Sequence, residues 1–309
     1  MKRQPRTPLY YTYSRFNEPT MTVDPGEWFE VETQMNRGPD ADRVNPELRD
    51  LYNAHRSDEM RTDIGNPSSG SIIVRGVKPG DMLTVHIGAI ETIPIGWTWY
   101  RGNTGAMPGW LGPSAIGEQF KLCRIEDGRI FWSDKLTLPV RPMIGCVGVA
   151  PGRDEAQHNG WAAKHGGNFD IQEITTGARV HLPVNVDGAL LQIGDMHAIQ
   201  GDGEICGGGG METGGTVRVM VEVSRRPAEM TWPRIENDTH IMTTGIEKPA
   251  EDAFRIALSE MILWLESGFG MPKGEAFMLL AQCLEARVTQ FVNPTYTYLC
   301  KLDREYLVG

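Results

Sequence analysis

Glycine and proline interrupt this chain so often that we expect short strands joined by turns over most of its length. The 309 residues include 36 glycines and 20 prolines. Glycine permits the backbone angles of tight turns, and proline lacks the N–H donor that a helix interior needs. Between these interruptions, residues 216–224 place valine at every second position, which is the period of a strand with one buried face. The pattern favours a β-rich fold over a helical bundle.

Two segments share the order strand, turn, strand. Residues 71–76 and 82–91 flank a Pro-Gly turn, and this pair predicts a β-hairpin. Residues 178–184 and 189–195 flank an Asp-Gly turn in a similar way, so a loose internal duplication is one interpretation. Further strands are predicted at 28–33, 130–142, 143–149 and 293–302.

Helical spacing is confined to the last part of the chain. Apolar residues recur every three or four positions from Pro249 to Glu266 and again from Phe277 to Phe291, which predicts two helices packed on a core. We therefore expect a β-rich α+β fold, with antiparallel strands and hairpins forming a sandwich or barrel-like core and two helices near the C-terminus. Residues 1–309 are expected to form a single domain, or two β-rich lobes with a boundary near 140–165.

Charge and cysteine usage limit the partners. The formal net charge of −10 argues against nucleic acid or an anionic membrane as the main partner. The first residues lack the apolar stretch of a secretory signal, and no run approaches the roughly 18 apolar residues of a membrane span. The five cysteines show no paired spacing, so reduced thiols and a cytoplasmic location are expected.

Four ionisable side chains separated by glycines fall within ten positions: Asp195, His197, Asp202 and Glu204. Such groups are costly to place beside a core unless they bind a metal, pair with one another or perform chemistry. Asp170 supplies a further oxygen ligand if its loop meets this segment. One imidazole with several carboxylates suits zinc or another first-row divalent cation with an open coordination position. The alternative is that each acid caps a turn, which we favour for any single aspartate but not for the whole cluster.

This composition suits hydrolysis. A bound metal polarises a carbonyl or lowers the pKa of water, and a carboxylate such as Glu204 takes and returns the proton. The glycine-rich backbone at 207–210 is a candidate source of N–H donors to an oxyanion. Cys206 is the rival nucleophile, but neighbouring carboxylates would raise its pKa and weaken it. The tryptophan-rich stretch 96–112 lines a pocket in one interpretation and folds back onto the core in the other.

Several segments together resemble one known family. The sequences GGNFD at 166–170 and LPVNVDGALLQIGDMHAIQGDGEICG at 182–207, followed by Glu212, are similar to the signature of the acetamidase/formamidase family. The earlier strands and the closing helices also have a similar order and spacing. The resemblance implies hydrolysis of a short linear amide such as formamide or acetamide to ammonia and a carboxylate. It also implies a homo-oligomer and a divalent metal, which we expect to be zinc, with calcium as the alternative.

The site residues follow from this resemblance together with the pattern of the sequence. We expect metal ligation by Asp170, Asp195 and His197, catalysis by Glu204 and Asp202, and substrate contact by Asn168, His165 and Trp99. Two departures from the family concern substrate choice: the run GGGGME at 207–212 is richer in glycine, and residues 66–68 stand where the family more often has a histidine and Thr-Gly-Pro. The alternative functions are a non-catalytic, metal-stabilised small-molecule binding protein of the same fold and a cysteine-dependent acyl transferase.

Overall fold

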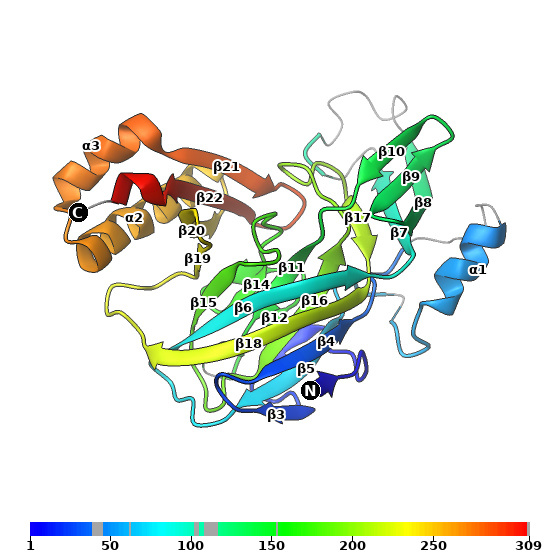
Figure 1. Ribbon diagram of the computed structural model, residues 1–309, viewed down its shortest axis with the longest axis horizontal. Helices are drawn as coiled ribbons and strands as arrows, with labels where there is room; N and C mark the ends of the chain where they lie inside the picture. Colours follow the sequence, from blue (N-terminus) through cyan, green and yellow to red (C-terminus); the bar gives the residue numbers. More distant parts are fainter. Residues whose placement is uncertain (39–45, 62, 102–104, 108–116, 153, 308–309) are drawn as a thin grey trace.

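Two large β-sheets form the body of the computed structural model, which describes residues 1–307 apart from 39–45, 62, 102–104, 108–116 and 153 (Figure 1). Strands of the first sheet follow the order β1 (Lys2–Gln4), β4 (Trp28–Thr33), β18 (Gly215–Arg225), β6 (Asp81–Thr92), β15 (Arg179–Pro183), β19 (Arg234–Glu236), β20 (His240–Glu247), β22 (Tyr296–Asp303) and β21 (Glu285–Gln290). Strands of the second sheet follow the order β10 (Leu136–Pro139), β9 (Arg129–Ser133), β8 (Glu118–Glu126), β7 (Ile95–Arg101), β17 (Gly208–Thr213), β16 (Leu191–His197), β11 (Met143–Gly148), β14 (Gly166–Asn168) and β13 (Ala162–Ala163). In addition, β5 (Ser68–Val74) pairs with β16, β3 (Met21–Val23) pairs with β5, and β2 (Thr12–Ser14) pairs with β12 (Ala156–His158).

The main core lies between the two sheets. In β18 the side chains of Val217, Val219 and Val221 are fully buried, and the residues between them are exposed or half-buried. They belong to the same buried cluster as Ile144 and Ile193 of the second sheet. Burying a valine or isoleucine side chain completely contributes about 1.5–3 kcal/mol, so this packing of sheet on sheet is a main source of stability. The alternation read from the sequence and the β-rich α+β class are confirmed.

Helices α2 (Ala250–Phe269) and α3 (Lys273–Cys283) lie at one end of the first sheet, whereas α1 (Pro46–Ala54) lies beside β7 and β8 (Figure 1). A Cβ atom at Gly245 of β20 would overlap the carbonyl of Ala253, so this glycine lets α2 pack directly on the strand. At its C-terminus α2 is capped by Gly270, which adopts φ 68° and donates its N–H to Glu266 O. A short 3-10 helix, η2 (Arg304–Leu307), follows β22. No helix in the described ranges has the length and apolar character needed to cross a bilayer.

The second closing helix is shorter than its spacing predicts. Helix α3 ends at Cys283, and Leu284 is already extended, with ψ 126°. Val288, which the spacing places on the helix, lies on β21, and Phe291 follows that strand. The prediction is wrong here because β21 pairs along most of its length with β22, and this pairing overrides a local helical pattern.

The two strand-turn-strand units are corners between the sheets and not hairpins. Strand β5 pairs with β16 in the second sheet, whereas β6 pairs with β15 in the first. Each unit therefore passes from one sheet to the other, and the two corners lie against each other. Two further predictions are also wrong in detail. Residues 95–101 form β7 where a loop is expected, and the strand expected at 130–142 is the antiparallel pair β9 and β10.

Candidate active site

Strand β16 carries two of the candidate metal ligands at the point where its neighbour changes. One edge of β16 pairs with β5 as far as Gly194 and with β17 from Met196 onward. Asp195 lies at this junction with φ 56°, a left-handed conformation that is uncommon for residues other than glycine. The regular alternation of the strand is therefore broken between Asp195 and His197, and both side chains are buried.

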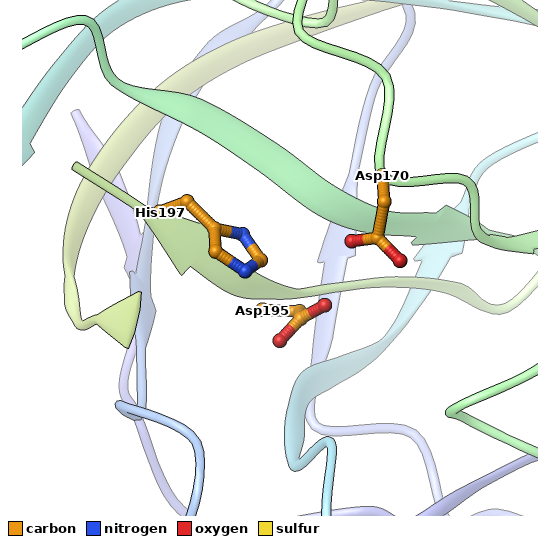
Figure 2. Close-up of side chains that lie close together, drawn as sticks. All are labelled: Asp170, Asp195 and His197. Carbon is orange, nitrogen blue, oxygen red and sulfur yellow. The ribbon is translucent and has the colours of Figure 1, made fainter. Parts of the chain in front are cut away.

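Asp170 reaches the same place from the loop after β14, also with a positive φ of 51°. Figure 2 shows its carboxylate close to the side chains of Asp195 and His197. Gly145 of β11 makes this approach feasible. A Cβ atom on Gly145 would lie 2.5 Å from Asp195 Oδ2 and 2.7 Å from Asp170 Oδ1, so any side chain there would displace the carboxylates.

Two glutamates complete the group around the imidazole. His197 Nε2 lies 3.3 Å from Glu212 Oε1 and 3.9 Å from Glu204 Oε1. A Cβ atom on Gly209 would overlap Glu204, and one on Gly210 would overlap His197. The glycine-rich run thus allows β17 to pack directly against both side chains. We call Asp170, Asp195, His197, Glu204 and Glu212 together the acid cluster.

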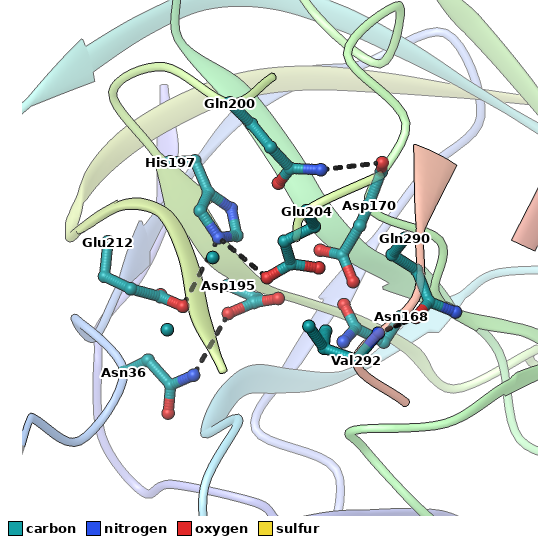
Figure 3. Close-up of polar contacts among 12 residues, drawn as sticks. Asn36, Asn168, Asp170, Asp195, His197, Gln200, Glu204, Glu212, Gln290 and Val292 are labelled. Atoms are coloured by element: carbon teal, nitrogen blue, oxygen red, sulfur yellow. Dashed lines mark hydrogen bonds and ion pairs between the residues drawn. The ribbon is translucent and has the colours of Figure 1, made fainter. Parts of the chain in front are cut away.

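Two asparagines far away in the sequence hold the aspartates in place, and Figure 3 shows the first of them, Asn36, beside Asp195. Asn36 Nδ2 donates to Asp195 Oδ1 at 3.4 Å, and Trp97 Nε1 fixes Asn36 by donating to its backbone carbonyl at 3.1 Å. Asn293 Nδ2 donates to Asp170 Oδ2 at 3.3 Å. Neither Asn36 nor Asn293 has a local pattern that would reveal this role, so sequence reasoning missed both.

The acid cluster is buried and holds more acid than base. Its five members are at most 6% exposed. Burial, followed by repulsion from neighbouring carboxylates, raises the pKa of Asp195 and of Glu204 well above the ordinary carboxyl range. Burial also raises the pKa of Asp170, although the nearby His197 opposes this. For His197 burial lowers the pKa, but the carboxylates of Glu212 and Asp195 outweigh it and raise the pKa to about 10.

Unpaired polar atoms show that the cluster fits a cation. Glu204 Oε2, Glu212 Oε2 and Asp170 Oδ1 are buried without a hydrogen-bond partner among the described residues, as are both ring nitrogens of His197. Ligand atoms lie within 4.8 Å of one another in two groups: Asp170, Asp195 and His197, and His197, Glu204 and Glu212. Burying an ionised carboxylate costs several kcal/mol of folding free energy unless a cation lies next to it. Imidazole and carboxylate donors suit zinc and other divalent ions.

Asp202 does not join the cluster. Its side chain is 67% exposed, and Oδ1 lies 2.8 Å from Nε of Arg287 on β21. The prediction that Asp202 takes part in catalysis is not supported by this placement. The chain turns between the two acids at Gly203 and Glu204, with φ 82° and 39°, and this turn leaves Glu204 buried and Asp202 exposed.

The three predicted substrate contacts lie in different places. Asn168 is buried beside the cluster, and its Oδ1 accepts a hydrogen bond from the Cys146 thiol at 3.2 Å. No described contact joins His165 to the acid cluster. Its ring lies 5.1 Å from that of Tyr13, and burial lowers its pKa to about 4. Trp99 Nε1 donates to Glu118 on the neighbouring strand, so this indole is held at the sheet surface. Trp110 of the tryptophan-rich stretch lies outside the described residues.

The cysteines differ sharply in their relation to the cluster. Cys206 is half-buried, its described polar contact is with the Gly209 carbonyl at 3.9 Å, and burial raises its pKa. Cys146 is the thiol at the site, 3.8 Å from Asp195 Oδ2. Burial, reinforced by the charge of Asp195, raises its pKa well above the ordinary value. A thiol with a raised pKa is a poor nucleophile, so neither residue favours a cysteine mechanism.

Comparisons with known proteins assign the family. The model of the Acetamidase/Formamidase family matches residues 153–300, a range that contains every member of the acid cluster. The solved acetamidase of Bacillus halodurans is 32% identical, with a TM-score of 0.85, and the alignment covers 98% of both chains. The chain belongs to the acetamidase/formamidase family.

Further relatives agree with this membership. A predicted acetamidase/formamidase from Thermoanaerobacter tengcongensis is 31% identical with a TM-score of 0.86, over 99% of this chain and 96% of that one. The acetamidase of Mycolicibacterium smegmatis is 47% identical over 60 residues, which are 19% of this chain. The matches to curated relatives span only 14–16% of the length of those proteins.

Proposed function

We propose that the protein is an amidase that hydrolyses the C–N bond of a short linear amide, such as formamide or acetamide, to ammonia and a carboxylate. The observation that carries this proposal is the buried carboxylate of Glu204, whose Oε2 has no hydrogen-bond partner among the described residues, beside a histidine and three further carboxylates. Membership in the family supports the substrate class, because relatives carry the names acetamidase and formamidase.

A divalent cation, zinc or alternatively calcium, is proposed to bind Asp170, Asp195 and His197. When bound, such a cation supplies Lewis-acid polarisation of a carbonyl and lowers the pKa of water. The chain's own contribution is to fix the ligands. Asn36 and Asn293 hold the two aspartates through hydrogen bonds, and Glu212 lies where it can orient the imidazole.

Glu204 is the proposed proton carrier. It accepts a proton from the attacking water and donates it to the nitrogen that leaves as ammonia, so the carboxylate is regenerated at the end of the cycle. Its side chain packs against Gly209, and its Oε1 lies 3.9 Å from His197 Nε2, which fixes its position. Of the three substrate contacts predicted from the sequence, Asn168 is the one we propose here. The Cys146 thiol contacts both Asn168 and Asp195, so Asn168 lies next to the acid cluster.

The test is ammonia release from a panel of short aliphatic and aromatic amides. We expect turnover by the wild type and a loss of about 10²-fold or more in Glu204→Gln, the range typical of a lost general acid-base group. Glu222→Gln is the matched control, because Glu222 is an exposed glutamate of β18 that pairs with His86. Cys206→Ala should retain activity. No ammonia from any amide, with folded and metal-loaded wild type, would contradict the proposal and favour a binding protein.

The assembly and the compartment are proposals as well. A homo-oligomer is expected from the family, and light scattering on the purified protein tests it, since the mass of a single chain would contradict it. A cytoplasmic location is supported by the five cysteines, all of which are free thiols. Fractionation of cells that express the protein tests this second point.

A further inference from the structure

The hairpin formed by β21 and β22 belongs to the first sheet, yet its loop reaches the acid cluster of the second. We call residues 291–295 the hairpin loop. Asn293 in this loop donates to Asp170 Oδ2, and the N–H of Phe291 donates to the carbonyl of Gly203 at 2.8 Å. Gly203 directly precedes Glu204. The hairpin loop is therefore bonded to two of the segments that bring acids into the cluster, those of Asp170 and Glu204.

Gln290 holds the hairpin loop in one conformation. Its Oε1 accepts hydrogen bonds from the N–H of Val292 at 3.0 Å and of Asn293 at 2.9 Å, and its Nε2 donates to Thr295 O at 2.8 Å. Gln290 is itself buried, at 1% exposure, so its side chain is held in place beneath the half-buried loop. A loop fixed in this way presents its side chains at defined positions, as a substrate-binding element requires.

Val292 lies between the two residues of the hairpin loop that are bonded to these segments. Its two neighbours in the chain each contact the site, and its own side chain is half-buried. Figure 3 shows Val292 beside Asn168, with its side chain directed toward Asp195 and Glu204. Its isopropyl group is apolar, whereas the acid cluster and Asn168 beside it are acidic, imidazole or amide groups. An amide substrate presents a polar end to such groups and an apolar acyl chain that needs an apolar contact.

We propose that Val292 contacts the acyl chain of the substrate and limits its length, so that the hairpin loop determines the preference for short amides. This inference rests on the proposed amidase function. It assigns specificity to a segment that follows β21, whereas the proton transfer is assigned to the loop after β16. In a pocket that packs against an acyl chain, one methylene changes discrimination by about 10-fold or more.

The experiment measures kcat/KM for formamide, acetamide, propionamide and butyramide with the metal-loaded full chain. Val292→Ala should raise the ratio of butyramide to acetamide by about 10-fold, and Val292→Leu should lower it by a similar factor. Val288→Ala is the matched control: the same change on the same hairpin, at a residue paired with Tyr298 and without a described contact to the cluster. Its ratio should stay within about 2-fold of the wild type. Thermal unfolding of each variant checks that the fold is retained.

The outcomes separate the two proposals. If the wild type hydrolyses amides but both Val292 variants keep the wild-type ratio, the specificity inference is refuted and the amidase function stands. If the wild type hydrolyses no amide, the amidase function fails. In that case the rise in Tm that each amide of the series causes is measured instead. If the dependence of this rise on acyl-chain length is the same in Val292→Ala as in the wild type, the contact between Val292 and the acyl chain is refuted as well.

Discussion

Gly145→Ala tests whether the acid cluster depends on the close approach of its two aspartates. The backbone of Gly145 is not in the left-handed region, so alanine meets no backbone strain there and only the added methyl group matters. That methyl group would lie 2.5 Å from Asp195 Oδ2 and 2.7 Å from Asp170 Oδ1, whereas ordinary contact begins near 3.4 Å. Each carboxylate must therefore move by about 0.7–0.9 Å, and the backbone carbonyl oxygen of Asp195, at 2.9 Å, by about 0.5 Å.

A misplacement of about 1 Å in a catalytic group costs roughly 10²-fold in rate, which corresponds to about 2.7 kcal/mol of transition-state stabilisation. We expect Gly145→Ala to lower kcat/KM by that factor and to lower the bound metal per chain. The folded state should survive, because overpacking of this kind costs about 1–3 kcal/mol and lowers Tm by no more than about 10 °C.

The assay combines ammonia release, metal content by mass spectrometry and thermal unfolding on one preparation. Gly201→Ala is the control, because Gly201 lies in the loop before Glu204 and a Cβ atom there has no neighbour within 4 Å. The control should keep wild-type activity and metal content. If Gly145→Ala keeps its activity within about 3-fold and its full metal content, the steric argument is refuted.

Two further predictions concern charged side chains. Asp202→Asn should lower kcat/KM by no more than about 5-fold, because an exposed ion pair contributes about 1 kcal/mol or less. A loss as large as that of Glu204→Gln would support Asp202 as a catalytic residue. Burial opposes the charge of Glu236, but its contacts with His181 and Arg179 outweigh this and lower its pKa from 4.5 to about 2. The charged form of Glu236 therefore stabilises the fold above about pH 4.5, and this stabilisation is lost as the pH falls toward 2. Glu236→Gln should lower the free energy of unfolding by about 2 kcal/mol at pH 7 and by clearly less at pH 3. Denaturant unfolding at the two pH values measures this, and equal losses would contradict the assignment.

Strand and helix patterns could be predicted from the sequence where one face of an element is buried. The valine alternation of β18 and the first closing helix are examples. Pairing partners could not be predicted, because a Pro-Gly turn looks the same whether the next strand stays in its sheet or crosses to the other. The sequence of the turn between β5 and β6 therefore does not reveal that the two strands enter different sheets. The end of α3 was missed because pairing of β21 with β22 is a long-range effect.

The residues of the site also divide into those that the sequence could predict and those that it could not. Asp195, His197 and Glu204 lie close together in sequence, and their composition among glycines is visible without a structure. Asp202 shares that composition, but the chain turns through Gly203 and Glu204, both at positive φ, and leaves Asp202 outside the cluster; φ values are not readable from residue type alone. Asn293 lies more than a hundred residues from the aspartate it contacts, and only the path of the first sheet brings the two together.

The most direct test of the account measures ammonia release and bound metal on the same sample. The wild type is stripped with a chelator and refilled stepwise with zinc or calcium, and acetamide turnover is followed against metal per chain, with Asp195→Asn in parallel. The account predicts that turnover falls with chelation and returns in proportion to occupancy, and that Asp195→Asn binds less metal and recovers little activity. Full turnover by metal-free, folded protein would contradict the assignment of the acid cluster as a metal site.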